Sequence, residues 1–255
     1  MTFPMLADFV LRLAGGLAAV LLLTPWRLVP LKFFRTHCLV ILGLLVVGAL
    51  DVARVGVRGP ELVAAIAAAV LAYAATVTWG LGLPKVATPL TALIVLATGF
   101  DLIADARVAD PSRWALNGSG RLASALLLGS SFSAMLLGHH YLTAPAMSIE
   151  PLKRFVQFSG WGLAVRAALA AVGLGVWLSL PATASSDAAV SPMLLVAMRW
   201  GMGIVGPAVA ILLAWKTVEI RSTQSATGIL YIAVTLVLFG ELTALVLSRE
   251  SGVIF

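Results

Sequence analysis

The sequence has little charge for its length. Of its 255 residues only 11% are charged, whereas 61% are hydrophobic. In an average soluble protein about a quarter of the residues are charged, because a polar surface must cover the core. This shortage excludes an ordinary soluble domain and predicts an integral membrane protein.

Cysteine is also scarce, and known catalytic motifs are missing. The single cysteine, Cys38, excludes an internal disulfide framework and a cysteine-built metal site. The sequence contains no G-x-S-x-G, H-E-x-x-H or Walker loop, so no catalytic residue is assigned and an enzymatic role stays open. The first 25 residues lack a basic leader and a cleavage site, so we expect a retained first helix.

The net charge of +6 does not indicate nucleic-acid binding. The basic residues are scattered in the gaps between apolar runs, where membrane topology and lipid headgroups explain them. The expected partner is therefore the lipid bilayer and not a nucleic acid, with other membrane or redox subunits as further candidates.

Long apolar runs are what the chain has in abundance. A helix needs about 20 mostly apolar residues to cross the hydrocarbon core. The sequence therefore predicts an all-α, polytopic transmembrane bundle of eight spans, for which we expect a bacterial inner membrane. Pro207 falls inside the seventh span and predicts a kink there. The predicted spans are residues 4–23, 33–55, 61–83, 87–106, 121–143, 155–181, 193–217 and 225–248.

A faint internal repeat divides the chain. LTPWRLVPLKFFR at residues 23–35 resembles LTAPAMSIEPLKRF at residues 142–155, and GFD at residues 99–101 corresponds to FGE at residues 239–241. The order of the matches is kept, which predicts two tandem four-helix halves, residues 1–107 and 119–255. Chance resemblance between apolar helices is the alternative.

The loops give the orientation. We call the side of the N-terminal end side A and the opposite side, side B. The side A loop at residues 179–192 has no basic residue, and the short loops of side B hold slightly more basic residues than those of side A. Because basic loops stay in the cytoplasm, side B is expected there, with both ends of the chain outside.

Three ionisable residues lie deep in the predicted spans. Arg166 is near the middle of the sixth span, and Arg199 and Glu241 lie about 10 Å inside side A, at ~1.5 Å per residue. Both arginines have glycines on their own helix face, so we expect them to point into the bundle, with Arg199 and Glu241 as a buried pair. Asp101, the repeat counterpart of Glu241, joins the candidate group.

Two interpretations of this group of charges remain open. Because an intramembrane charge costs about 3 kcal/mol or more, it usually faces protein or water and often marks a functional site. The group is therefore either a structural ion pair that fixes helix packing or a site for an anion, protons or a quinone. A water-filled cavity on side A is a further hypothesis.

The three histidines raise the possibility of haem. His140 lies on the helix face of Gly129 and Ser133, a pair of small residues typical of helix contacts, whereas His139 lies on a bulkier face. With eight spans, His37 lies on the same side of the membrane as both. Two histidines at one membrane face can ligate a b-type haem, but interfacial histidines without a ligand are common.

Three functional classes follow from these observations. The first is a membrane subunit of a redox complex that handles quinone, haem or protons. Quinol-binding anchor subunits of the polysulfide-reductase type are similar in having eight spans in two four-helix bundles, a likeness of architecture and not of sequence motif. The second is a small-solute or ion transporter or channel with its site between the halves. The third is a structural or assembly protein.

Overall fold

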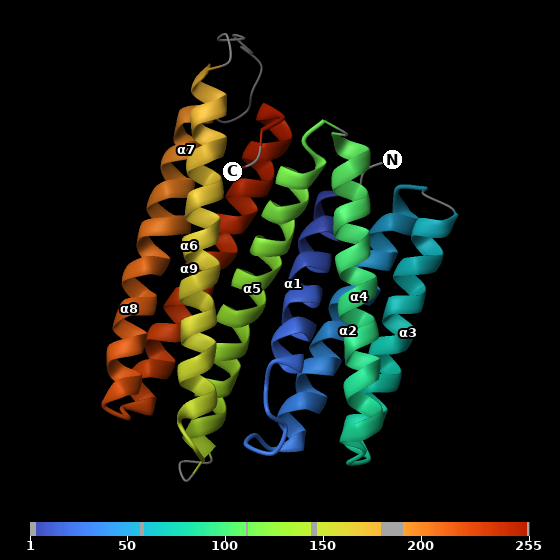
Figure 1. Ribbon diagram of the computed structural model, residues 1–255, viewed down its shortest axis with the longest axis vertical. Helices are drawn as coiled ribbons and strands as arrows, with labels where there is room; N and C mark the ends of the chain where they lie inside the picture. The colour runs from blue at the N-terminus through green and yellow to red at the C-terminus, as the bar shows by residue number, and fades with distance from the viewer. Residues whose placement is uncertain (1–3, 57–58, 111, 144–146, 180–190, 254) are drawn as a thin grey trace.

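A computed structural model describes residues 4–56, 59–110, 112–143, 147–179, 191–253 and 255. These residues form helices joined by short turns, and no strand occurs among them. The described residues therefore form the all-α bundle that the apolar runs predict (Figure 1). Eight helices are long and apolar enough to cross a membrane, where α7, η1 and α8 count together as one span, Pro192–Glu219. The helices are α1 (Met5–Leu22), α2 (Leu31–Arg54), α3 (Pro60–Gly80), α4 (Pro84–Ala109), α5 (Trp114–Thr143), α6 (Glu150–Ser179), α7 (Pro192–Trp200), the π-helical turn η1 (Gly201–Val205), α8 (Gly206–Glu219) and α9 (Thr223–Ser251).

Two helices begin well before the apolar runs do, by more than a turn. α5 starts at Trp114 instead of residue 121, and α6 at Glu150 instead of residue 155. Backbone hydrogen bonding continues beyond the hydrocarbon core, and Arg154 adds an ion pair to Glu150 one turn away, 3.2 Å from Nε to Oε1. An apolar run in the sequence therefore predicts the part of a helix that lies in the membrane, but it does not predict where the helix begins. Residues 144–146 of the second repeat motif and 180–190 of the uncharged side A loop lie outside the described residues.

The helices pack in two groups. In the first, α1 contacts α2 and α4, and α3 contacts α2 and α4. In the second, α5 contacts α6 and α9, and α8 contacts the same two helices. α1 and α4 both lie against α5 and join the groups (Figure 1). That the two groups are tandem repeats of each other stays a prediction.

α1 and α5 form the centre of the bundle, and they cross with their backbones in contact. A Cβ atom on Gly16 would lie 1.8 Å from the carbonyl oxygen of Ala125, and one on Gly129 would lie 2.1 Å from the carbonyl carbon of Gly16. Only glycine fits at such an approach. Gly129 therefore makes the close helix contact that its spacing from Ser133 predicts.

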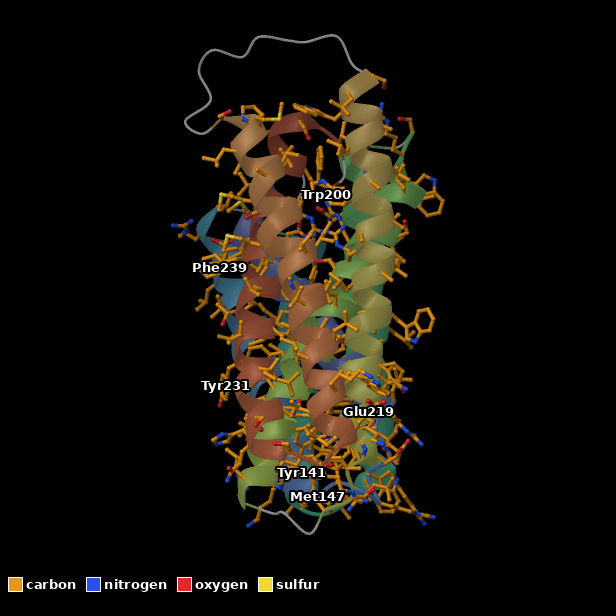
Figure 2. All side chains as sticks on the ribbon, turned by 90° about the vertical axis from the view of Figure 1, so that its left-hand side faces the viewer. Tyr141, Met147, Trp200, Glu219, Tyr231 and Phe239 are labelled. Atoms are coloured by element: carbon orange, nitrogen blue, oxygen red, sulfur yellow. The ribbon has the colours of Figure 1, made fainter. Side chains whose placement is uncertain are left out.

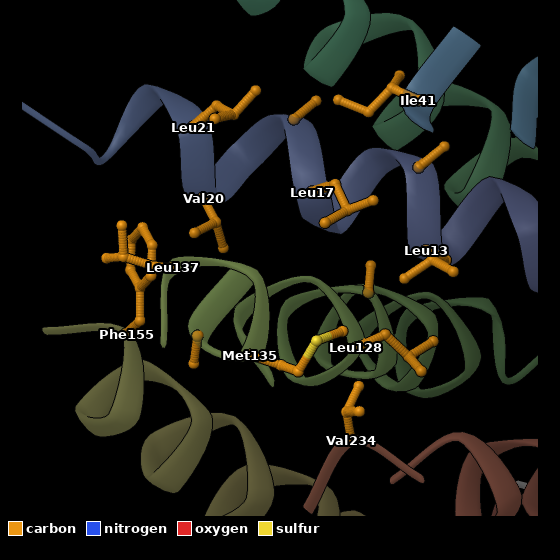
Figure 3. Close-up of a cluster of buried hydrophobic side chains, with 14 of the residues drawn as sticks. Leu13, Leu17, Val20, Leu21, Ile41, Leu128, Met135, Leu137, Phe155 and Val234 are labelled. Atoms are coloured by element: carbon orange, nitrogen blue, oxygen red, sulfur yellow. The ribbon is translucent and has the colours of Figure 1, made fainter. Parts of the chain in front are cut away.

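Apolar side chains fill the space around this crossing. Leu17 and Val20 of α1 face Leu128 and Leu137 of α5, and Val234 of α9 closes the cluster from below (Figure 3). Lipid tails are as apolar as these side chains, so such packing stabilises the bundle by close fit more than by removal from water. It also keeps α1 and α5 away from lipid, which lets both helices carry polar groups.

The seventh span is interrupted where the sequence places Pro207. The π-helical turn η1 stands between α7 and α8, and the amide of Gly206 bonds the carbonyl of Gly201, five residues back. Proline has no amide hydrogen and clashes with the preceding turn, so the helix before it adopts a wider turn. The interruption begins directly after Arg199 and Trp200.

Candidate functional site

One carboxylate in the bundle holds two arginines from different helices. Glu241 of α9 accepts from Nε and Nη2 of Arg166 on α6, at 3.0 and 2.9 Å, and from Nη1 of Arg199 on α7, at 3.0 Å. All three side chains are at most 1% exposed. We call Arg166, Arg199 and Glu241 the inner cluster.

Main-chain oxygen atoms add to the inner cluster. Arg166 also donates from Nη2 to a main-chain carboxyl oxygen of Phe255, the last residue of the sequence, at 2.7 Å, and Arg199 donates from Nη1 to the carbonyl oxygen of Gly240 at 3.2 Å. The π-helical turn meets α9 closely here, since a Cβ atom on Gly240 would lie 2.2 Å from the Cα of Gly203. The small residues that flank Arg199 thus bring α7 and α9 close enough for the ion pair to form.

A second group of charges lies nearer side A, and we call it the outer cluster. Arg12 forks onto Asp8 on the same helix, with Nε–Oδ1 at 2.9 Å and Nη2–Oδ2 at 2.8 Å. Arg121 of α5 and Arg249 of α9 also approach Asp8, at 3.8 and 3.9 Å, and Arg121 forms an ion pair with Asp105 of α4. The outer cluster therefore ties together helices of both groups.

A cavity of about 260 Å³ lies between the two clusters. Its walls come from α1, the residue that ends α4, α5, α6, α9 and the segment that follows α9, and they combine charged, polar and apolar side chains. Arg166 is at once a wall of this cavity and a member of the inner cluster. The lining residues are Asp8, Arg12, Asp110, Asn117, Gly120, Arg121, Arg166, Leu245, Ser248, Arg249, Gly252, Val253 and Phe255.

Positive charge exceeds negative charge around the cavity. Among the described residues, the side chains of the two clusters together contain five guanidinium groups and three carboxylates, and the main-chain carboxyl group of Phe255 adds one more acceptor on Arg166. Asp110 also lines the cavity, but Arg113 lies 3.9 Å from it and balances its charge. The side chains thus carry an excess of two positive charges in a part of the protein where few of them reach solvent. The members are Arg12, Arg121, Arg166, Arg199 and Arg249 with Asp8, Asp105 and Glu241.

Asp110 stands at the mouth of the cavity, outside the membrane spans. Its Oδ1 accepts a hydrogen bond from the hydroxyl of Ser112 at 2.6 Å and others from the amides of Ser112 and Arg113. The Ser112 hydroxyl bond is the main reason that the pKa of Asp110 lies below its usual value. The side chain therefore carries a negative charge under all ordinary conditions.

The candidate residue Asp101 lies apart from both clusters. It lines a narrow pocket of about 20 Å³ in the first helix group, together with apolar residues such as Ala7, Leu45 and Ala65. Of the four candidate intramembrane charges, the structure thus brings together Arg166, Arg199 and Glu241 and separates Asp101 from them.

The histidines lie in different surroundings. His37 is fully buried on α2, where its Nδ1 lies 3.0 Å from the carbonyl oxygen of Phe33 and its ring lies 4.0 Å from that of Phe33. His139 is exposed and its Nδ1 is 3.4 Å from the hydroxyl of Tyr231, in the side B half of α9 (Figure 2). His140 is partly buried on α5.

His37 and the other two histidines lie on helices that do not pack extensively on each other. α2 packs mainly on α1 and α3, whereas α5 packs on α1, α4, α6 and α9. Among the described residues, no group of three or more histidine, cysteine, aspartate or glutamate side chains could hold a metal ion. Haem ligation by His37 and His140 or His139 stays a prediction.

Sequence reasoning did not single out Arg121 and Arg249 as site residues. Arg121 lies at the edge of the predicted fifth span and Arg249 just after the eighth, so both resemble ordinary interfacial charges. The available signal was Asp8 with Arg12 inside the first span, because such a charged helix needs polar neighbours at the same depth.

Comparison with known proteins adds no relative. No family model, no curated protein and no solved structure matches the chain.

Proposed function

We propose that the protein carries a small anion across the membrane and that the anion first binds in the cavity between the two clusters. The observation that supports this most is the excess of two arginines over side-chain carboxylates in the two clusters beside that cavity. Arginine is the residue best suited to bind carboxylate, phosphate and related anions, because its planar fork donates two parallel hydrogen bonds.

The low polarity of the surroundings makes the excess charge costly. Cations that are buried without a counter-charge are destabilising by several kcal/mol, and a structural role alone is served by equal numbers of each sign. A bound anion removes this cost, so the excess of arginine favours anion binding. The cavity volume of about 260 Å³ suits an anion of small size.

The position of the cavity fits a transporter better than a static binding protein. α1 contributes one wall from the first helix group, and α5, α6 and α9 contribute the others from the second. In many transporters the substrate binds where two helix bundles meet, and movement of one bundle against the other exposes the site to each side in turn. The proposal therefore places transport at the interface of the two groups.

Anion uptake into liposomes tests this proposal. Purified protein in liposomes of neutral lipid is given radiolabelled phosphate, sulfate, acetate or chloride, and uptake is compared with protein-free liposomes. Arg249→Gln removes a cavity arginine whose side chain is 39% exposed, so the variant is expected to fold. Its matched control is Arg54→Gln, since that side chain lies near side A with 81% exposure and pairs with Asp51 away from the cavity.

The expected result is uptake of at least one anion by the unmodified protein, several-fold slower uptake by the Arg249→Gln variant and normal uptake by the Arg54→Gln variant. The proposal is wrong if no tested anion enters above the protein-free level. It is equally wrong if both variants transport at the same rate.

The redox-subunit interpretation has separate support. The Nε2 atom of His37 is buried and has no hydrogen-bond partner among the described residues, as a metal-binding nitrogen would be. An apolar pocket of about 400 Å³ between α6 and α8, which Gln157 and Trp215 help to line, has the character of a quinone site. A reduced-minus-oxidised spectrum of the purified protein and a titration with a quinone analogue test it, and failure of both rejects it.

A further inference from the structure

The groove of about 400 Å³ between α6 and α8 lies on an outer face of the bundle. The two helices run side by side there (Figure 2), and the lining residues Ala164 and Leu212 are exposed on that face. Small residues, Gly160 of α6 and Ala208 of α8 among them, leave the space between the helices open. The groove has the size of a ligand site, since small-molecule pockets measure about 300–1,000 Å³.

The length of the groove matches one leaflet of the bilayer. On α6 the lining extends from Val156 to Ala167, and on α8 and the turn before it from Trp215 back to Ile204. Each stretch is about 16 Å long at ~1.5 Å per residue, whereas the hydrocarbon core is about 30 Å thick. The groove therefore reaches from the side B surface to the middle of the membrane. A lipid acyl chain ends at that depth, whereas a partner helix would cross the full thickness.

The polarity of the lining changes along the groove. Gln157 and Trp215 lie toward its side B end, and all other lining residues are aliphatic or glycine. Tryptophan is enriched at the level of lipid headgroups because its ring is apolar and its N–H is polar. A phospholipid has the same order of groups, with polar ester groups at the membrane surface and an apolar chain below them.

A lysine stands at the side B end of the groove. Lys153 precedes Val156 by three positions and Gln157 by four, so it lies on the groove face of α6, one turn nearer the surface. The acidic side chains at this end of the two helices are already paired, Glu150 with Arg154 and Glu219 with Lys216. Lys153 is thus a half-buried cation without an ion pair among the described residues.

We propose that the groove binds one acyl chain of an anionic phospholipid from the side B leaflet and that Lys153 binds the phosphate of that lipid. Basic residues next to the membrane surface attract anionic headgroups, and a lysine is a common phosphate ligand. A quinone would fit the same apolar walls but carries no charge to balance Lys153. The proposal does not depend on anion transport through the cavity on side A.

Native mass spectrometry of the purified full chain in detergent tests this proposal. The protein is titrated with phosphatidylglycerol and, separately, with phosphatidylcholine that carries the same acyl chains. The expected result is one tightly bound phosphatidylglycerol per chain and several-fold weaker binding of phosphatidylcholine, whose headgroup ammonium is repelled by Lys153. Glycerol phosphate, which has the phosphate and lacks the chain, should not compete.

Two pairs of variants assign the binding to the groove. Lys153→Gln should raise the dissociation constant for phosphatidylglycerol about fivefold, the contribution typical of one lysine near an anionic lipid surface. Its control is Lys32→Gln, since Lys32 is an exposed side B lysine in the first helix group. Ala164→Leu fills the groove from an exposed position and should weaken binding several-fold. Its control is Ala171→Leu, an exposed α6 position beyond the side A end of the groove.

The proposal is wrong if phosphatidylglycerol binds no more tightly than phosphatidylcholine. It is also wrong if either groove variant binds phosphatidylglycerol as tightly as its control does. A quinone analogue that binds equally well to the Lys153→Gln and Lys32→Gln variants and displaces no phosphatidylglycerol-dependent signal, because none is present, assigns the groove to a quinone and rejects the lipid.

Discussion

Glu241 and Arg166 are 75 positions apart in the sequence and meet in a two-pronged ion pair at the centre of the second helix group. The same carboxylate also binds Arg199, so one side chain of α9 holds α6 and α7 in place. Removing the charge of Glu241 would leave both arginines without a counter-charge in a low-dielectric interior.

Glu241→Gln should destabilise the protein strongly. The substitution keeps the shape of the side chain and leaves two buried arginines without a counter-charge, and breaking a buried pair in this way typically costs about 3–5 kcal/mol. Thermal unfolding in detergent, followed by tryptophan fluorescence, measures the loss. Glu219→Gln is the control, because Glu219 is 41% exposed and pairs only with Lys216 on the surface. Equal melting temperatures for the two variants would contradict the prediction.

Gly129→Ala should separate α1 from α5. The added methyl group would lie 2.1 Å from the backbone of Gly16, a distance that no side-chain adjustment can relieve. Overpacking of a core usually costs about 1–3 kcal/mol, and a clash with backbone lies at the upper end or beyond. Gly43→Ala on α2 meets nothing within 4 Å and should leave the melting temperature unchanged or slightly raised. Thermal unfolding of the two variants tests the prediction, which is wrong if Gly129→Ala melts at the same temperature as Gly43→Ala.

Anion uptake should be insensitive to the titration of Asp110 between about pH 5 and pH 7. Because the pKa of Asp110 is lowered in the folded state, its charge is lost only when the pH falls through that lowered value, and the stability it contributes is lost in the same acidic range. Asp110→Asn removes a negative charge from the mouth of the cavity and should raise the apparent affinity for the anion throughout this interval. Curves of uptake against pH that converge toward pH 5 would show that Asp110 titrates there after all.

Residues on the two faces of the bundle should react with reagents from opposite sides of the membrane. Cys38 is fully buried, so Cys38→Ala provides a background without reactive thiol. In it, Gln224→Cys on side B should be labelled by a membrane-impermeant maleimide only from the cytoplasm, and Ser112→Cys on side A only from outside. The reverse pattern in intact cells and inverted vesicles would invert the orientation that the loops predict.

The fold could be predicted from the sequence because lipid imposes a simple requirement. Each span needs about 20 apolar residues, and prolines mark the connections, so the eight helices follow from composition alone. The early starts of α5 and α6 could not be read in this way, because their first turns are polar and are held by backbone hydrogen bonds and by the Glu150–Arg154 pair.

The sequence predicts the candidate site only in part. Depth and helix spacing indicate that Arg199 faces Glu241 and that Arg12 reaches Asp8 one turn away, and the structure shows both contacts. The contact of Arg166 with Glu241 depends on how α6 is rotated against α9, which depth does not specify. Asp101 lies at a depth comparable to that of Glu241 but in the first helix group. Membrane depth therefore places the two residues together in the prediction, whereas helix packing separates them.

The central place of α1 has a consequence for the assembly of the protein in the membrane. α1 precedes α5 and α9 in the chain, so during synthesis it enters the bilayer before Arg121 and Arg249 exist to meet Asp8. The fork between Arg12 and Asp8 lies wholly within α1, 2.8 Å across at its shortest, and lets the helix insert as a neutral unit. The Arg12–Asp8 pair, which α5 and α9 approach in the folded protein, thus also keeps α1 stable in the bilayer before those helices are made.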